Sequence, residues 1–338
     1  MTNLDLRQNH LIQAHVLDGL SSLPSNSVQM VVTSPPYWGM RRYDFGMHSV
    51  WPDKLKVPFG AEAKPEQYIE RTRLLLELLK PKIKDDGTIW WNLRDSYFTR
   101  AILRDSSSER LAAFEGRLNR KWKDAPLKRT SSGHSYLKDK DLTLIPFLVA
   151  YEAQKLGYWV RAFVTWEKET LAPEKSIDRP VLSHEYLIML TKSRFYKWNS
   201  DKAVEAVVNG NGLIERQLRS VWTMKPSLGR NGHPAPFPEK LVRRCIDLSS
   251  NERDVVLDPF IGSGTTAIVA YETNRKFVGI DLVRKYLNHA KKDLITRFPK
   301  LKVNIMRIVP KKTSKPISKV KNKKISKTVK KALVKNKK

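Results

Sequence analysis

Short apolar runs along this chain alternate with longer segments in which apolar residues recur every three or four positions. Runs of the first kind predict strands at 27–33, 87–93, 159–167, 254–260 and 276–282. Segments of the second kind predict helices at 65–83, 144–158, 236–250 and 264–274. Two further runs within 185–199 predict a strand hairpin. Strands that alternate with helices build a mostly parallel sheet covered on both faces, so the pattern predicts a doubly wound α/β fold.

The stretch VVLDPFIGSGTTAIVAYETNRKFVGID, residues 255–281, predicts a binding site for a nucleoside cofactor. A strand ends at Asp258, a loop with Gly262 and Gly264 follows, and a helix then begins. Glycines let a ligand approach the backbone closely, and the free amides of a helix start favour an anionic group. Asp281 ends the next strand, where a carboxylate can accept hydrogen bonds from ribose hydroxyls.

Two cofactors fit this loop to different degrees. In the dinucleotide pattern G-x-G-x-x-G the third glycine is replaced here by Ala267, which that pattern sometimes allows, so NAD stays open on this point. Asp258 and Phe260, however, place a carboxylate and a ring at the loop, which favours an ammonium group over a pyrophosphate. The loop therefore favours S-adenosylmethionine.

The stretch VVTSPPYWGM, residues 31–40, leaves a buried strand through two prolines. Pro35 and Pro36 donate no backbone hydrogen bonds and fix an extended exit, which presents Tyr37 and Trp38. Ligands of α/β sheets bind at the carboxyl ends of strands. The segment is either part of a binding site or an ordinary loop whose aromatic residues belong to the core. For Trp38 we favour a place in the core.

The charge balance indicates a polyanionic partner. Lysine and arginine total 63 against 34 acidic residues, a net charge of +29, and no long apolar span accompanies them. Nucleic acid is thus favoured over a membrane. The beginning of the chain has no signal-peptide pattern, and the one cysteine, Cys245, excludes an intrachain disulfide and a cysteine metal cluster. We expect a cytoplasmic protein that gathers on the nucleoid through DNA and holds no metal.

Two motifs together resemble a known family. TSPPYWG at 33–39, followed much later by DPFIGSGTT at 258–266, is similar to the amino-group DNA methyltransferases of the permuted beta order (the N-4/N-6 family of restriction-modification systems). The resemblance covers most of residues 10–290. It implies a Rossmann-like sheet of seven strands, one of them antiparallel, in which 28–33 and 254–258 lie side by side. It also implies S-adenosyl-L-methionine, double-stranded DNA and a cognate restriction endonuclease as a functional partner; self-association is plausible.

The same resemblance places the chemistry at Ser34, Pro35, Pro36 and Tyr37. An exocyclic amine is a poor nucleophile, and acceptors such as the Ser34 hydroxyl and the Pro35 carbonyl can concentrate its lone pair on nitrogen. Methyl transfer is then direct, while Tyr37 stacks on a flipped-out base. A serine before the prolines favours the N4 amine of cytosine, with the N6 amine of adenine as the alternative. Ring-carbon methylation needs a cysteine nucleophile, and Cys245 lies in a helical apolar pattern typical of a core residue.

The remaining candidate residues contact the cofactor or DNA. Asp18 is either a cofactor contact or a plain turn aspartate. The cofactor candidates are Asp258, Phe260, Gly262, Ser263, Gly264, Thr265, Thr266, Asp281, Phe237 and Asp18. The DNA candidates are Arg41 and Arg42, which otherwise pair with Asp44 or Asp53, together with Arg117, Arg120 and Lys121. Base recognition is expected from a basic insertion at 100–140 and from 200–232.

We expect a catalytic domain over residues 1–300 and a lysine-rich, disordered tail over 301–338. Residues 311–338 hold 13 lysines and no acidic residue, which suits a contact with DNA phosphates or, alternatively, a tail that only adds solubility. Three other functions compete with a DNA methyltransferase: an RNA or protein amine methyltransferase, a nicotinamide dehydrogenase and a non-catalytic DNA-binding module.

Overall fold

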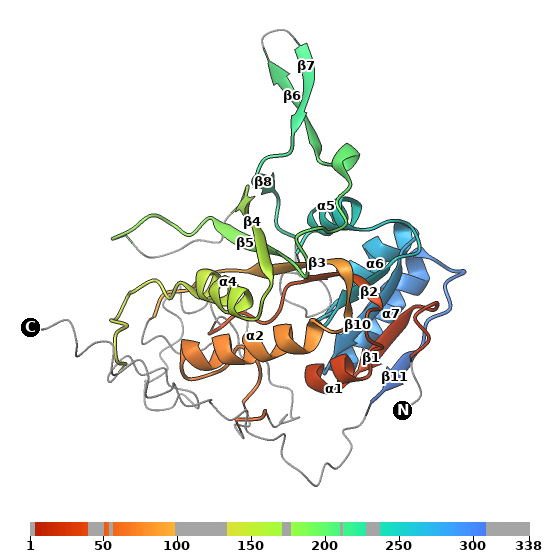
Figure 1. Cartoon of the computed structure of the whole chain (residues 1–338), viewed down its shortest axis with the longest axis horizontal. Helices are drawn as coiled ribbons and strands as arrows, with labels where there is room; N and C mark the ends of the chain where they lie inside the picture. The colour runs from red at the N-terminus through yellow and green to blue at the C-terminus, as the bar shows by residue number, and fades with distance from the viewer. Residues whose placement is uncertain are drawn as a thin grey trace, which may run out of the picture. The chain divides into compact units, whose positions relative to one another are not determined.

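The computed structural model describes residues 4–39, 51–53, 57–98, 134–170, 177–209, 212–227 and 237–308. Within these residues nine strands form one sheet: β1 (His10–Gln13), β2 (Val28–Thr33), β3 (Ile83–Leu93), β4 (Trp159–Lys168), β5 (His184–Thr191), β8 (Val221–Met224), β9 (Val255–Asp258), β10 (Lys276–Asp281) and β11 (Ile305–Arg307). Their order is β11-β1-β10-β9-β2-β3-β5-β4-β8 (Figure 1).

The pairing confirms the predicted α/β class. β5 is antiparallel to both β3 and β4, whereas the other neighbouring pairs of this sheet are parallel. β2 lies directly beside β9, with Met30 opposite Val256, as the resemblance implied. The expected count of seven strands was wrong for the described residues, because the short strands β8 and β11 extend the sheet at its two edges.

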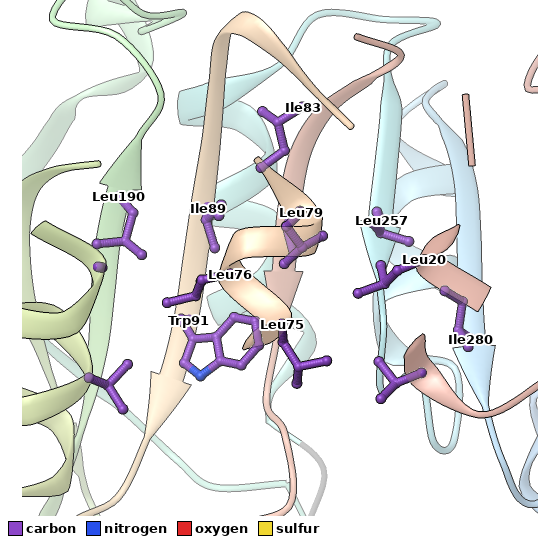
Figure 2. Packing of buried hydrophobic residues seen from close by; sticks show 14 of the residues in the cluster. Leu20, Leu75, Leu76, Leu79, Ile83, Ile89, Trp91, Leu190, Leu257 and Ile280 are labelled. Atoms are coloured by element: carbon purple, nitrogen blue, oxygen red, sulfur yellow. The ribbon is translucent and has the colours of Figure 1, made fainter. Parts of the chain in front are cut away.

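Helices cover both faces of the sheet in two layers. α1 (Val16–Ser21), α2 (Pro65–Leu79) and α4 (Ile145–Lys155) lie on one face. α5 (Glu239–Ser249), α6 (Thr265–Glu272) and α7 (Arg284–Arg297) lie on the other. Figure 2 shows leucines of α2 packed against Ile89 and Trp91 of β3. These side chains are buried, and each contributes about 1.5–3 kcal/mol by leaving water.

Several predicted elements differ in their bounds from those observed; for example, β3 already begins at Ile83, where the predicted helix 65–83 ended. Residues 194–199 form no strand; their amides at Lys197 and Asn199 instead bond to the carbonyls of Asp86 and Leu248, and the hairpin partner of β5 is β4. The compact unit also runs to Ile308 and not to residue 300. Leu301 is buried and β11 pairs with β1, so the apolar residues in 301–308 complete the core before the lysine-rich segment begins.

A second, two-stranded sheet lies within the region 200–232. β6 (Val204–Asn209) and β7 (Gly212–Gln217) form an antiparallel hairpin that extends away from the large sheet (Figure 1). Glu205 accepts hydrogen bonds from both Arg216 and Arg219. In the described part of the chain, no helix has the length and apolar content needed to cross a bilayer.

Candidate active site

The polar side chains of the candidate site converge on one edge of the sheet, namely the edge formed by the carboxyl ends of its parallel strands. Parallel strands end at the same edge, which brings together the ends of β10, β9, β2, β3 and β4. β5 runs the other way, so the start of this strand reaches that edge. The edge therefore carries, in spatial order, Asp281, Asp258, Thr33, Asn92, Glu185 and Lys168.

The glycine loop between β9 and α6 is held by contacts with α7 and with Asp281. Gly262 and Gly264 have φ values of 49° and 91°, a region that glycine adopts without strain. A Cβ on Gly264 would lie 2.7 Å from Cβ of Ala290, so α7 packs directly against this turn. The Gly262 amide donates to Asp281 Oδ2 at 3.0 Å, and the Val283 amide donates to Oδ1 at 2.8 Å. Burial raises the pKa of Asp281 to about 6, although these two bonds favour its carboxylate.

Asp258 joins the glycine loop to the end of β2. Its Oδ1 accepts from the Thr33 hydroxyl at 2.6 Å and from the Phe260 amide at 3.0 Å, and its Oδ2 accepts from the Thr266 hydroxyl at 2.7 Å. The residue is 1% exposed, and burial raises its pKa to about 6 against the pull of these bonds. Asp258 and Thr266 thus hold the fold together, and their contact with a cofactor stays a prediction.

The loop that follows β2 carries a hydrogen-bond network. Tyr37 donates its phenol proton to Glu185 Oε2 at 2.6 Å, and the Ser34 hydroxyl lies 2.9 Å from the Tyr37 oxygen. The Asn92 amide donates to the Tyr37 oxygen at 2.6 Å, to Glu185 Oε2 at 2.8 Å and to Ser34 Oγ at 3.3 Å. Tyr68 donates to the Pro36 carbonyl at 3.0 Å. The loop is therefore fixed through both its side chains and its backbone.

The surroundings of Tyr37 and Glu185 determine the protonation state of each side chain. Burial and the neighbouring Glu185 carboxylate raise the pKa of Tyr37, so the phenol keeps its proton. Burial alone would raise the pKa of Glu185, but the Lys168 ammonium group and the donors Tyr37 and Asn92 outweigh it and lower that pKa. Lys168 pairs with Glu185 Oε1. At neutral pH the site thus holds a carboxylate behind a neutral phenol.

Other predicted residues have mixed surroundings. Trp38 is 1% exposed and stacks on Phe98, which confirms its place in the core. Cys245 is buried on α5, and burial raises the pKa of its thiol, as expected of an inert core residue. Phe237 is buried beside the start of α5, whereas Asp18 is half-buried on α1; their cofactor contacts stay predictions.

The DNA candidates Arg41, Arg42, Arg117, Arg120 and Lys121 lie outside the described residues. Asp53, an alternative partner for the first two, forms an ion pair with Arg71. At the end of the 100–140 insertion, His134 Nε2 lies 2.9 Å from Glu66 of α2.

The sequence analysis missed Asn92, Lys168 and Glu185. Asn92 is the second-to-last residue of the apolar strand β3, and only the ends of β2, β9 and β10 carried a recognisable motif. Lys168 and Glu185 flank the β4–β5 turn, and an acidic residue directly before the apolar run YLIMLT was a usable signal. That signal is informative only once β5 is known to be the antiparallel strand, because the start of that strand then lies at the active edge.

Comparison with known proteins identifies the family of the chain. A model of the N6/N4 family, described as DNA methylase, matches residues 28–292. Among curated relatives, the type II methyltransferase M.XycI of Xanthomonas campestris pv. cyanopsidis is 36% identical, over 85% of this chain and 88% of its own. M.Cfr9I of Citrobacter freundii, also a type II methyltransferase, is 35% identical, over 90% of this chain and 92% of its own.

Solved structures agree on the fold. A putative DNA modification methylase of Thermus thermophilus, complexed with S-adenosyl-L-methionine, has a TM-score of 0.57 at 21% identity, over 88% of this chain and 99% of its own. The cytosine-N4-specific PvuII DNA methyltransferase has a TM-score of 0.58 at 17% identity, over 88% of this chain and 95% of its own.

The sheet order and the likeness to these structures define a Rossmann-like α/β fold. The chain belongs to the N6/N4 DNA methylase family. This membership confirms two predictions, a DNA methyltransferase activity and S-adenosyl-L-methionine as the cofactor. It leaves the target amine to be argued from the site.

Proposed function

We propose that this protein transfers a methyl group from S-adenosyl-L-methionine to the N4 amine of a flipped-out cytosine at a specific site in double-stranded DNA. The observation that carries the proposal is the hydrogen-bond network behind Ser34. Its support comes from the direction in which the protons of that network point.

The network makes the Ser34 hydroxyl an acceptor toward the substrate. A phenol has one proton, and Tyr37 gives it to Glu185. The contact between Ser34 and Tyr37 must then use the serine proton. A lone pair of Ser34 Oγ therefore stays available for an amine hydrogen, which is what activation of an exocyclic amine requires.

The transfer itself needs alignment and no covalent enzyme intermediate. Ser34 Oγ and the Pro35 carbonyl accept hydrogen bonds from the amine, which favours its pyramidal form and concentrates the lone pair on nitrogen. S-adenosyl-L-methionine supplies an electrophilic methyl group. Tyr37 offers its ring face to the flipped-out base, and its anchored hydroxyl group fixes the plane of that ring.

The cofactor pocket is proposed at the glycine loop. Gly262, Ser263, Gly264 and Thr265 present the backbone of the loop, and Asp281 accepts hydrogen bonds from the ribose hydroxyls. Phe260, Phe237, Asp258, Thr266 and Asp18 are the remaining proposed contacts. Among these proposed contacts, Asp281 has the most specific support, because its carboxylate lies at the end of β10 beside the loop amides.

The base assignment rests on Ser34, since serine at this position accompanies cytosine methylation in the family that the chain resembles; adenine N6 is the alternative. Digestion and mass spectrometry of DNA methylated in vitro distinguish them, with DNA from a host free of its own methylation as substrate. N4-methylcytosine supports the proposal, and N6-methyladenine overturns the base assignment. A product without methylated nucleosides overturns the function.

The names of the relatives support a role as the modification half of a restriction system with its own endonuclease. Mapping the methylated positions tests this role, which requires one short recurring sequence. DNA contacts are proposed for Arg41, Arg42, the 100–140 and 200–232 regions and the lysines of 311–338. Deletion of 311–338 should weaken DNA binding and flatten its salt dependence without changing methyl transfer at saturating DNA. An unchanged salt dependence of DNA binding would show that residues 311–338 do not contact DNA.

A further inference from the structure

We propose that Glu62, held by Arg71, is a positioning residue. It aligns the loop 34–39 that follows β2, which we call the catalytic loop, with the glycine loop between β9 and α6, which we call the cofactor loop. This inference rests on the proposed function and concerns residues 57–62, which precede α2 and take no part in the hydrogen-bond network behind Ser34. We refer to this segment as the bridge segment.

The bridge segment lies against the backbone of the catalytic loop. The Gly39 amide donates to the Gly60 carbonyl at 2.7 Å. Gly60 has a φ of 88°, and a Cβ there would lie 3.0 Å from the Tyr37 carbonyl and 3.1 Å from Cβ of Pro36. The contact is tight, and the positive φ would strain any other residue, so we expect a small shift of the bridge segment to shift Tyr37.

The other side of the bridge segment contacts the cofactor loop. Phe59 is 6% exposed, and its ring lies 5.4 Å from that of Phe260 with an interplanar angle of 20°. Phe260 lies within the glycine loop, two residues before Gly262. The bridge segment is thus packed between the two loops whose separation sets the distance from the methyl group to the amine.

Glu62 fixes this segment from within the core. The residue is 1% exposed; its Oε2 accepts from the Gly60 amide at 2.9 Å, and its backbone carbonyl accepts from the Trp38 indole at 2.9 Å. Its Oε1 accepts from Arg71 at 3.0 Å. One carboxylate therefore ties Gly60 to helix α2, while its own backbone holds the far end of the catalytic loop.

Arg71 is a buried guanidinium group with several acceptors. Besides Glu62 it donates to the Val57 carbonyl at 3.1 Å and, with two nitrogens, to the Asp53 carboxylate at 3.1 and 3.2 Å. It also lies 4.6 Å from the ring of Trp51. Such a planar fork is rigid and cannot be replaced by lysine without loss of bonds. The pair has the properties of a support for a reacting geometry.

The test compares Glu62→Gln with Glu77→Gln, the same substitution on an exposed residue of α2. Glutamine offers one acceptor where Glu62 uses two, so the bridge segment shifts. We expect kcat for methyl incorporation into genomic DNA to fall about 10- to 100-fold, because small misplacements have effects of that size. The Kd for S-adenosyl-L-methionine should stay within about threefold, since β9 and β10 hold the glycine loop.

Two further measurements separate alignment from general destabilisation. Leu248→Ala, at a buried residue of α5 outside the proposed site, should lower the melting temperature while kcat stays within about twofold. In Glu62→Gln the Gly39 amide should exchange with deuterium about tenfold faster. Arg71→Lys should reproduce both changes, and the double variant should be no worse than either single one.

The proposal is overturned if an active wild type and Glu62→Gln share the same kcat and the same Gly39 exchange. It is also overturned if Leu248→Ala lowers kcat as much as Glu62→Gln does. If the wild type methylates no DNA, the proposed function has failed instead, and the Gly39 exchange still tests the alignment.

Discussion

The proposed cofactor half and the proposed catalytic half of the site are built in different ways. The cofactor half is the continuous stretch 255–281, in which the Gly262–Asp281 bond spans 19 residues and involves a backbone amide. The catalytic half consists of Ser34, Tyr37, Asn92, Lys168 and Glu185. There the Tyr37–Glu185 bond spans 148 residues and joins side chains. A local backbone site tolerates distant changes, whereas a site assembled from side chains depends on each of its members.

The largest effect is expected from Glu185→Gln. Glutamine can donate as well as accept, so the proton directions at Tyr37 and Ser34 are no longer fixed, and Lys168 loses its partner. We expect kcat to fall at least about 100-fold, of the order seen when one preorganised donor is lost, with unchanged S-adenosyl-L-methionine affinity. Single-turnover methyl transfer measures the loss of rate, and calorimetry measures the affinity for S-adenosyl-L-methionine. The matched control is Glu167→Gln, an exposed residue of the same hairpin. A parallel loss of cofactor binding would refute the division into halves.

Asp281→Asn should show the opposite pattern. The side chain still accepts one hydrogen bond, but its charge for the ribose hydroxyls is lost. Hydrogen bonds to charged groups contribute about 1.5–3 kcal/mol, so cofactor affinity should fall roughly 10- to 100-fold. At saturating cofactor kcat should recover. Asp254→Asn, which lies before β9 at the far edge and pairs with Lys84, is the control. A kcat that stays low at saturation would contradict the assignment.

Thr33→Val removes the side-chain bond that joins the two halves. Valine keeps the shape of threonine but leaves Asp258 without one of its donors in a buried position. We expect the free energy of unfolding to fall by about 1–3 kcal/mol, measured by urea denaturation. Thr33→Ser keeps the hydroxyl and should lose less. Equal losses in the two variants would show that packing of the methyl group, and not the bond, matters.

The last prediction concerns the pH dependence of stability. Asp258 and Asp281 have pKa values of about 6, above the ordinary value of 3.8, so the folded chain holds protons that the unfolded chain has lost. Their contribution to the free energy of unfolding is present below about pH 3.8 and is lost as pH rises through about 6, a change of about 3 kcal/mol for each group. Asp258→Asn should reduce the slope, and exposed Asp201→Asn should not. A slope unchanged by Asp258→Asn would mean that other groups carry it.

The sequence predicted the cofactor half better than the catalytic half for a physical reason. Strand, glycine turn, helix and Asp281 follow one another, so local rules on glycines and strand ends were sufficient to propose the site. Ser34 and Tyr37 were found from their motif. Asn92, Lys168 and Glu185 depend on which strands are neighbours and on the direction of β5, and neither follows from a local pattern. Glu62 gives no local signal, because its burial arises only when α2 packs on the sheet.

The bond between Thr33 and Asp258 joins residues 225 positions apart, which has a consequence for synthesis. A ribosome adds about 5–20 residues per second, so β2 leaves it roughly 10–45 s before its neighbour β9 is made. During that interval β2 can pair with β3, while its other edge waits. A nascent chain thus carries the SPPY segment long before it has any place for a methyl donor. Activity begins only when the last third of the protein has emerged.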